Sequence, residues 1–284
     1  MKLSKIFALL LALCLISSAA CAATFTDAHG NVIELDDSLE AYTAVTLVGA
    51  DNAARQGETN LGDLWADALR WFAVSGEINA AFDEDDVKAG NDRIAVDADH
   101  VVALWNGGNL RADIAEGTFG AEALAEVLPF PNKVAVVYMT GAQLLETLEA
   151  ASQGLPYTAE TADACASLMQ VSGLTYTVDT TKAYDALEAY GDHWFTAGSV
   201  SRVRIDDVNG QPFDAEATYA VVTSNANFNG MDSSYVLKAA AEANGQSAVT
   251  TAVVRDVVFR FIAAELNHQV GEAYAAPQGR LTIL

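Results

Sequence analysis

The chain reads Val-Val-Ala-Leu-Trp-Asn-Gly-Gly-Asn-Leu-Arg over residues 101–111, and this stretch indicates how it folds. The first five residues form an apolar run of strand-favouring type, which predicts a buried strand over Val101–Trp105. Asparagine and glycine then end the strand and form a polar loop. The sequence therefore places Arg111 in a polar loop at the end of a buried strand.

Strands and helices alternate on both sides of this stretch. The other predicted strands cover residues 43–48, 133–139, 169–179, 199–206, 218–223 and 280–284. The predicted helices cover residues 60–75, 120–127, 140–152, 234–243 and 248–266. A hairpin over Phe25–Leu35 and an Asn-Gly turn at 209–210 require antiparallel strand pairs. We therefore predict an α+β (mixed α/β) fold, in which helices pack on a mixed sheet.

Two of these helices carry specific signals. Over Asn60–Ser75 apolar side chains recur every three or four residues, which predicts an amphipathic helix with the stripe Leu61, Leu64, Trp65, Ala68, Leu69 and Phe72. Thr140 and Gln143 have the spacing of a capping box, which predicts a helix start.

Two long connections separate the predicted elements. Residues 76–99 contain the acidic run 83–86 and are expected to form a surface insertion. Residues 180–198 are expected to form a long connection that carries Tyr184, Tyr190 and Trp194. Asp97, Asp99 and His100 near the next strand are interpreted as a solvated strand end rather than a metal site.

Composition excludes several classes of protein. Of the 284 residues 51% are hydrophobic and 19% charged, so the chain can bury a sizeable core and wholesale disorder is excluded. Fifteen Lys and Arg against 38 Asp and Glu give a net charge of −23, which argues against binding to nucleic acid or to an anionic membrane. A small anionic ligand held by a few arginines remains compatible with this charge.

The first 22 residues predict export. Lys2 and Lys5 precede an apolar run that is too short to span a bilayer, and small residues follow up to Ala22. We expect a signal peptide over 1–22, a mature chain that begins at Ala23 and a periplasmic or extracellular location. Lipid anchoring through Cys21 is the disfavoured alternative. Residues 23–49 are predicted to form a hairpin and strand extension, and residues 50–284 one domain.

Cys165 is the single cysteine of the predicted mature chain. It has no cysteine to pair with in that chain, so the fold must rest on its core rather than on disulfides. We interpret Cys165 as a buried apolar residue rather than a nucleophile.

Six short stretches, in order, resemble one family. They read Arg-Gln-Gly-Glu-Thr-Asn-Leu-Gly (55–62), Asn-Gly-Gly-Asn-Leu-Arg (106–111), Leu-Pro-Phe-Pro-Asn (128–132), Thr-Gly-Ala-Gln-Leu (140–144), Gln-Val-Ser-Gly-Leu (170–174) and Val-Asn-Gly-Gln-Pro (208–212). Together they resemble the C-terminal, substrate-binding domain of the exported 5′-nucleotidase / UDP-sugar hydrolase family, from about residue 50 to the end of the chain. The resemblance implies that the chain binds a nucleotide or nucleoside.

Residue chemistry indicates which side chains would hold such a ligand. Arg55 and Arg111 lie in polar loops, and the forked donors of arginine suit phosphate oxygens. A surface ion pair is the alternative for both, and Asn106 either binds the ligand or caps its turn. Phe130 lies between two prolines, where its ring either stacks on a base or anchors the loop in the core.

The resemblance assigns these positions more closely. It implies that Arg55, Asn106 and Arg111 hold phosphate or nucleoside, that Phe130 is one ring of an aromatic clamp, and that Asp232 binds ribose hydroxyls. The second ring of the clamp is missing, because Ala226 stands at its position and Met231 replaces a glycine. Either Phe228 or Tyr235 compensates, or the clamp is one-sided.

The family's metal site has no counterpart in this sequence. Family enzymes carry an N-terminal metallophosphatase domain with two metal ions, and too few residues precede the strand at residue 43 to form one. Asp27 and His29 imitate one metal motif but are interpreted as hairpin residues. We therefore expect a free-standing domain with no catalytic residue, no metal and no cofactor of its own, a divalent metal entering only with a separate metallophosphatase partner.

Functions of different classes remain open. The first is a nucleotide- or nucleoside-binding module that complements a separate metallophosphatase in nucleotide catabolism. The second is a phosphoric-ester hydrolase in its own right, and the third is a structural or interaction protein that kept the fold. A fourth, an extracytoplasmic transport receptor, rests only on the similarity of residues 25–30 to the opening of some iron-complex receptors.

Overall fold

The computed structural model describes residues 24–26, 32–35 and 40–284. The chain separates into two compact units, Met1–Ser38 and Leu39–Leu284. In the first unit β1 (Thr24–Thr26) and β2 (Val32–Glu34) pair as an antiparallel hairpin, which confirms that prediction. The predicted signal peptide with Cys21, and the pair Asp27 and His29, lie outside the described residues.

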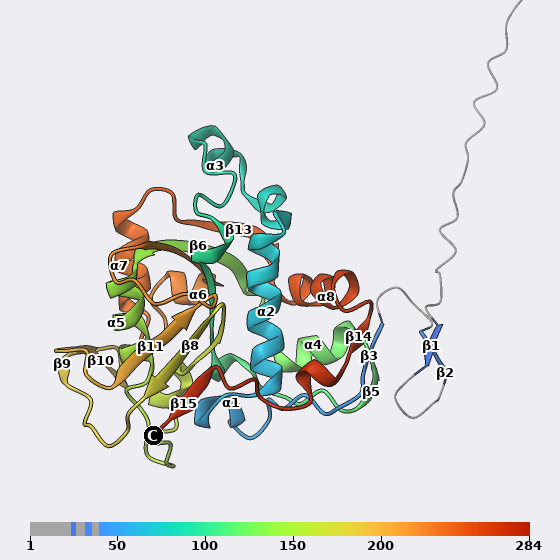
Figure 1. The fold of residues 1–284 in the computed structure, drawn as a ribbon, viewed down its shortest axis with the longest axis horizontal. Coiled ribbons are helices and arrows are strands. Elements are labelled where there is room, and N and C mark those ends of the chain that lie inside the picture. Colours follow the sequence, from blue (N-terminus) through green and yellow to red (C-terminus); the bar gives the residue numbers. More distant parts are fainter. Residues whose placement is uncertain (1–23, 27–31, 36–39) are drawn as a thin grey trace, which may run out of the picture. The chain divides into compact units, whose positions relative to one another are not determined.

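A five-stranded sheet forms the centre of the second unit (Figure 1). The strands, in spatial order, are β13 (Ala248–Val253), β6 (Lys133–Thr140), β12 (Thr218–Ser224), β4 (Val101–Asn106) and β7 (Met169–Ser172). Strands β12 and β4 run parallel, and the other three neighbouring pairs are antiparallel. This arrangement confirms the predicted mixed sheet and the α+β class.

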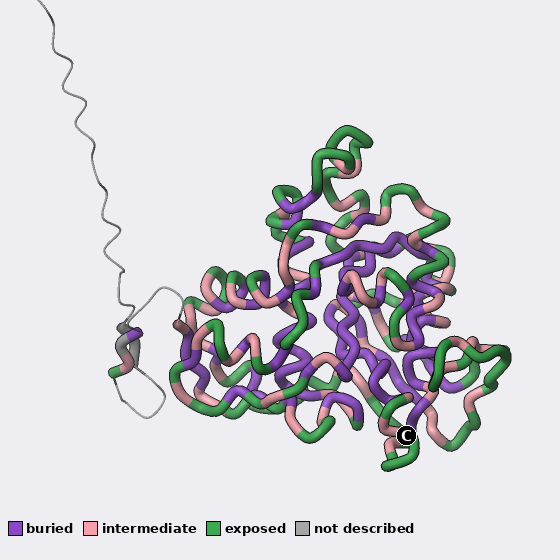
Figure 2. The backbone as a smooth tube through the Cα atoms, turned by 180° about the vertical axis from the view of Figure 1, so that it is seen from behind, coloured by how far each residue is buried: buried purple, intermediate pink, exposed green. Residues whose placement is uncertain are grey.

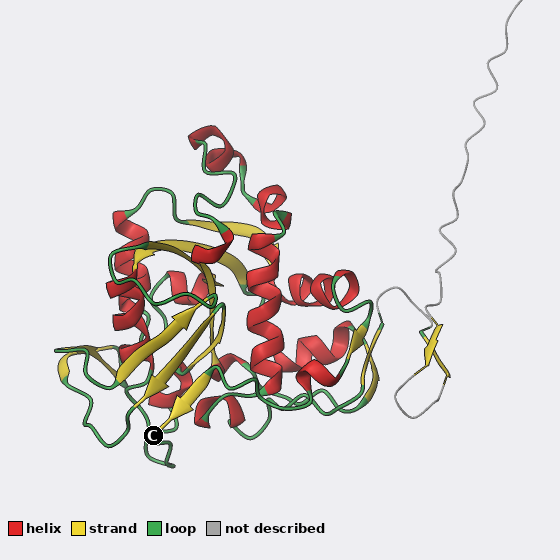
Figure 3. Ribbon diagram, in the orientation of Figure 1, coloured by secondary structure: helices red, strands yellow, loops and turns green. Residues whose placement is uncertain are grey.

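Both faces of this sheet are buried. Successive side chains of a strand point to opposite sides, so each strand contributes to two cores. Along β4, Trp105 and its alternate neighbours contribute to a first core, and Val102 and Leu104 to a second. Helices α2 (Asn60–Val74) and α8 (Val254–Ala264) cover the first core. Helices α5 (Gly141–Ala151) and α7 (Tyr235–Ala243) cover the second, on the other side of the sheet (Figure 3).

Helix α2 forms as its apolar stripe predicts. All six predicted stripe residues are fully buried, and the indole of Trp65 lies 6.3 Å from that of Trp105, centroid to centroid. The Thr59 side chain caps the helix by accepting a hydrogen bond from the Gly62 N–H. Thr140 and Gln143 form the predicted capping box at the start of α5.

Smaller elements surround the central sheet. One three-stranded sheet contains β11 (Val203–Val208), β8 (Leu174–Val178) and β15 (Leu281–Ile283), and another contains β14 (Gln269–Val270), β3 (Ala41–Thr43) and β5 (Gly117–Phe119). The short helices are α1 (Ala53–Gln56), α3 (Glu84–Ala89), α4 (Ala121–Val127) and α6 (Asn225–Phe228). Short 3₁₀ turns are η1 (Glu77–Ala81), η2 (Ala98–His100), η3 (Gly107–Asn109), η4 (Ala164–Ser167) and η5 (Glu272–Tyr274).

The strand predicted over 43–48 is wrong in its bounds. Strand β3 ends at Thr43, where the side-chain hydroxyl donates to the Val45 carbonyl at 2.6 Å and so turns the backbone out of the strand. Only Leu47 pairs again, in an isolated bridge with Ile114.

The strand predicted over 169–179 is two strands. Gly173, at a φ of 80°, separates β7 from β8, which belong to different sheets. The Asn209-Gly210 turn is confirmed, with φ values of 51° and 75°. It does not join two paired strands, however, because β11 pairs with β8 while β12 lies in the central sheet.

Two further segments differ from their predictions. Residues 180–198 contain the hairpin β9 (Ala186–Tyr190) and β10 (Trp194–Ala197), whose mostly exposed side chains give no apolar alternation to detect (Figure 2). The helix predicted over 248–266 begins only at Val254, because the β-branched run before it pairs with β6 as strand β13.

Residues 76–99 form short helical turns rather than a plain loop. Helix α3 contains no buried residue, as a surface insertion requires. Ile78 and Ala81 of η1 nevertheless join the first core. In the part of the chain that the structure describes, no helix has the length and apolar character needed to cross a membrane.

Candidate ligand-binding site

The loop after β4 is held by backbone contacts at both ends. The Gly107 N–H donates to the Leu168 carbonyl at 2.7 Å, and the Arg111 N–H donates to the Val127 carbonyl at 2.9 Å. Gly107 also packs so closely on α1 that an added Cβ would lie 1.9 Å from the Ala54 carbonyl oxygen. The loop and α1 are therefore fixed against each other, which brings the segment of Arg55 next to the segment of Arg111.

The side chain of Gln170 in β7 holds α1 in place through hydrogen bonds. Its side-chain amide donates to the carbonyls of Ala54 and Gly57, at 3.0 and 2.9 Å, and its oxygen accepts from the Thr59 N–H at 3.0 Å. Only 2% of Gln170 is exposed, so these bonds are made in a dry environment. The sequence indicated Gln170 only as part of the 170–174 motif. The structure shows that its side chain holds α1 in place.

Asn106 and Asp232 form the polar centre of the site. The fully buried Asn106 amide donates to the Asp232 carboxylate at 2.7 Å, and Asn109 donates to the Asn106 carbonyl oxygen at 2.8 Å. Burial raises the pKa of Asp232, and the positive charges of Arg55 and Arg111 act in the opposite direction. These three charged side chains therefore lie near enough to influence one another.

Arg111 lies against an aromatic ring. Its guanidinium carbon is 5.9 Å from the ring centroid of Phe130, within cation–π range. Phe130 lies between two prolines and is 46% exposed, although it is large and apolar. The alternative of a core anchor is therefore wrong for Phe130.

Arg55 is placed behind these residues. It is only 9% exposed, its guanidinium donates to the Ala162 carbonyl at 2.8 Å, and it lies 3.7 Å from the Asp163 carboxylate. Asp163 itself is largely exposed, so this ion pair is weak and open to exchange. Arg55 is thus near the site but already has partners.

A cavity of about 390 Å³ opens beside these side chains. Its lining residues are Asn109, Arg111, Phe130, Pro131, Asn132, Asn225, Ala226, Asn229, Met231 and Asp232. Three of the six predicted site residues, Arg111, Phe130 and Asp232, therefore share one cavity. Asn106 and Arg55 do not line it: Asn106 donates to Asp232, and Arg55 acts on Asp232 only through its positive charge.

Phe228 does not line this cavity, contrary to the prediction. It packs against the second core, and so does Tyr235, whose hydroxyl accepts from the Ala197 N–H and donates to the Glu146 carboxylate. Neither ring replaces the one that Ala226 lacks. Met231, which we noted only as the replacement of a glycine, lies on the cavity and is 59% exposed.

Four asparagines that line the cavity were not predicted as site residues from the sequence. They are at positions 109, 132, 225 and 229. Their signal was the density of Asn and Gly in two loops, which predicts turns as readily as a site.

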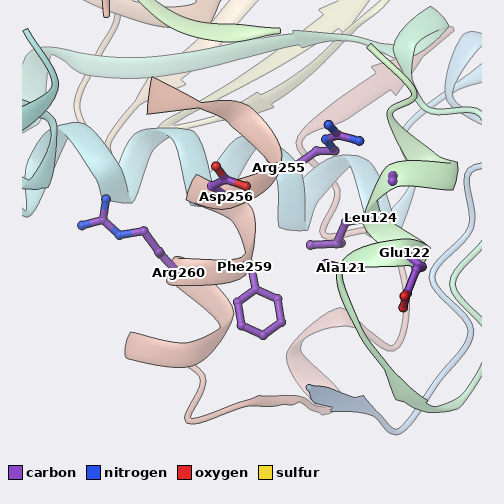
Figure 4. Close-up of a pocket in the computed structure, with 8 residues that line it drawn as sticks. Ala121, Glu122, Leu124, Arg255, Asp256, Phe259 and Arg260 are labelled. Carbon is purple, nitrogen blue, oxygen red and sulfur yellow. The ribbon is translucent and has the colours of Figure 1, made fainter. Parts of the chain in front are cut away.

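A larger cavity, of about 500 Å³, lies between α4 and α8 (Figure 4). Leu124 and Phe259 lie between the two helices, and Arg260 points away from α4. None of the predicted site residues lines this cavity. Its charged side chains do not converge on a common point, so it has weaker features of a ligand site.

The remaining reactive side chains are placed as simple structural groups. Cys165 is buried, and burial raises the pKa of its thiol, which disfavours the nucleophilic thiolate. Asp97 and His100 form an exposed pair, with 2.6 Å between carboxylate and ring nitrogen. No group of three or more His, Cys, Asp or Glu side chains in the described ranges is arranged to hold a metal ion.

Comparison with known proteins identifies the fold around this cavity. The sequence model described as "5′-nucleotidase, C-terminal domain" matches residues 40–239, which include every residue that lines it. The chain belongs to the 5′-nucleotidase C-terminal domain family. The predicted family is therefore confirmed.

Individual relatives agree with this assignment. The trifunctional nucleotide phosphoesterase protein YfkN of Bacillus subtilis (strain 168) is 29% identical over 188 residues, which cover 65% of this chain and 10% of YfkN. The 5′-nucleotidase precursor from Thermus thermophilus is 29% identical at a TM-score of 0.61, over 86% of this chain and 39% of the precursor.

The NAD nucleotidase of Haemophilus influenzae shares the fold at 14% identity, with a TM-score of 0.57 over 92% of this chain and 48% of that one. The chain spans less than half the length of each of these three relatives.

Proposed function

We propose that the unit Leu39–Leu284 binds a nucleotide or nucleoside in the cavity formed by Arg111, Phe130 and Asp232. The observation that carries this proposal is the convergence of a cation, an exposed aromatic ring and a half-buried carboxylate on one cavity. In a chain of net charge −23, two arginines near enough for their charges to interact form a local site for an anion. The names of the relatives, which refer to nucleotides, support the same ligand class.

Each group has a distinct task in this proposal. Arg111 binds the phosphate, with Arg55 behind it adding positive charge. Asn106 occupies one oxygen of Asp232, and the other oxygen accepts no hydrogen bond from any described residue, so it is available to a ribose hydroxyl. Phe130 stacks on the base.

Calorimetry with AMP and adenosine tests this proposal. The wild-type protein should bind AMP more tightly than adenosine, and Arg111→Ala should weaken AMP binding about ten-fold or more while leaving adenosine nearly unchanged. Phe130→Ala should weaken both ligands. Arg204→Ala is the matched control, because Arg204 is an exposed arginine of β11 paired with Asp206. If the wild-type protein binds neither ligand at millimolar concentration, the proposal is wrong.

We also propose that hydrolysis belongs to a separate metallophosphatase, which this domain complements in nucleotide catabolism. The chemistry of the cavity supports this division, because its side chains suit binding and provide no His, Asp and Asn set for two metal ions. Purified residues 23–284 should therefore release neither phosphate from AMP nor UMP from UDP-glucose with added Mn²⁺, Co²⁺ or Zn²⁺. Metal-dependent turnover by a preparation free of contaminating phosphatase would favour the alternative of a hydrolase in its own right.

Export remains part of the proposal. The mature protein should begin at Ala23 and carry no lipid, in the periplasm or outside the cell. The intact mass of the protein from the exported fraction measures this directly. An acylated Cys21 would show membrane anchoring instead.

A further inference from the structure

Met231 is an exposed apolar side chain on the cavity of the proposed site. Besides Phe130, it is the one large apolar residue among those that line the cavity, and both are roughly half exposed. The other apolar lining residues, Pro131 and Ala226, are small. Ligand cavities combine such apolar walls with a few placed polar groups, so Phe130 and Met231 are the surfaces that an apolar part of a ligand would cover.

The backbone on both sides fixes Met231 in this position. Its own N–H donates to the Ala226 carbonyl at 3.0 Å. Gly230 before it has a φ of 88° and Asp232 after it a φ of 46°, so two left-handed residues enclose it. The Ser234 N–H donates to the Asp232 carbonyl and closes the turn. This loop carries both Met231 and the carboxylate of the site.

Tyr190 of the β9–β10 hairpin holds this loop from outside the cavity. Its hydroxyl donates to the Gly230 carbonyl at 2.7 Å. A Cβ at position 230 would lie 2.3 Å from that hydroxyl, so the contact requires glycine there. The Tyr190 ring also packs on that of Tyr235, at 5.6 Å between centroids, which connects the hairpin to α7.

We propose that Met231 forms a second apolar wall of the base site beside Phe130, and that Tyr190 is the positioning residue that sets this wall. The inference rests on the proposed function and names a contact within it. A methionine side chain is flexible and polarisable and adapts its shape to its neighbour. The site therefore accepts nucleobases of different size, in contrast to a slot between two rigid rings.

Four variants test the wall and its support with adenosine as the probe. Met231→Ala should weaken adenosine about five-fold, because it removes the apolar surface, and Met231→Leu should stay within about two-fold of wild type. Tyr190→Phe should weaken adenosine about three-fold. Tyr184→Phe is the matched control, because its hydroxyl donates to the Phe195 carbonyl within the same hairpin and does not reach the loop.

A double-mutant cycle separates positioning from general support. If Tyr190 acts through Met231, Tyr190→Phe should have no further effect on adenosine binding in the Met231→Ala background. Thermal unfolding of all four variants shows whether each is folded, and Tyr190→Phe should melt within a few degrees of Tyr184→Phe. Equal binding by Met231→Ala and wild type overturns the wall, and equal effects of Tyr190→Phe in both backgrounds overturn the positioning role. Binding of AMP without measurable binding of adenosine by the wild-type protein overturns the apolar base site, and absence of binding of both ligands overturns the proposed function itself.

Discussion

The side-chain amide of Asn106 donates a hydrogen bond of 2.7 Å to the carboxylate of Asp232, 126 positions further along the chain. Asn106 is the last residue of β4, and Asp232 lies in the loop between α6 and α7. The bond therefore connects the end of a central strand to the loop that carries one wall of the cavity. Burial raises the pKa of this carboxyl group, and the positive charges of Arg55 and Arg111 oppose the rise.

Asn106→Ala should destabilise the protein by about 1.5–3 kcal/mol, because it leaves a largely buried carboxylate without its donor. Denaturant unfolding at neutral pH measures this free energy. Asn109→Ala is the comparison, since Asn109 donates only to the neutral Asn106 side chain, and its loss should cost about 1 kcal/mol. Equal losses of unfolding free energy in the two variants would contradict a larger contribution of the Asn106–Asp232 bond to stability.

Gly107→Ala should disrupt the contact between the β4 loop and α1. The added methyl group would overlap the Ala54 carbonyl, and backbone cannot move aside as the end of a flexible side chain can. We expect a loss of about 1–3 kcal/mol or more in unfolding free energy. Gly107→Ala should also weaken AMP binding, because α1 carries Arg55.

Gly245→Ala is the control for this change. No atom lies within 4 Å of a Cβ at Gly245, so the substitution should change the free energy of unfolding by less than about 0.5 kcal/mol. If Gly107→Ala is equally mild, the loop and α1 are not held as tightly as the structure indicates.

Periodic apolar patterns allowed the core to be predicted from the sequence. The stripe of α2 and the apolar runs of β4 and β6 are buried as their patterns predict. An apolar side chain every 3.6 residues gives a helix one apolar face to bury, and a continuous apolar run gives a strand that is buried on both faces. The β9–β10 hairpin was missed for the complementary reason. Its strands bury almost nothing, so burial left no pattern in them.

The site could be predicted only where a residue's chemistry was unusual for its surroundings. Arg111 and Phe130 stood out as a cation in an acidic chain and a ring between prolines. The placement of Phe228 on the second core, away from the lining of the cavity, could not be predicted, because the side on which a ring of a short helix lies depends on tertiary packing that local sequence does not encode. Tyr190 was out of reach, since its bond to Gly230 joins segments forty residues apart.

Buried Asp63 and half-buried Glu58 hold the C-terminal segment against the start of α2. The fully buried Asp63 accepts from the Gln278 N–H at 3.1 Å, and Glu58 accepts from the Leu281 N–H at 2.9 Å. The second oxygen of each, Asp63 Oδ1 and Glu58 Oε1, is buried without a hydrogen-bond donor. Arg280 lies near Asp63 but forms its shorter ion pair, of 2.8 Å, with Asp67.

Burial raises the pKa of Asp63 to about 8, with the negative charge of Glu58 adding to the rise and Arg280 opposing it. A carboxyl with a folded-state pKa above its unfolded value keeps a proton that the unfolded chain releases. Folding then takes up a proton between pH 4 and pH 8, so the free energy of unfolding falls as pH rises through this window. Below pH 4 and above pH 8 this group contributes no slope.

Asp63→Asn should remove this pH dependence, because an amide keeps the shape of the neutral acid and has no proton to lose. Denaturant unfolding at pH 5, 6, 7 and 8 should show a smaller fall in stability for the variant than for wild type, by up to about 1.4 kcal/mol per pH unit. The variant should therefore be the more stable of the two at pH 8. Glu216→Gln, which alters an exposed carboxyl, should keep the wild-type slope. Parallel wild-type and Asp63→Asn curves would show that Asp63 is ionised in the folded protein throughout this range.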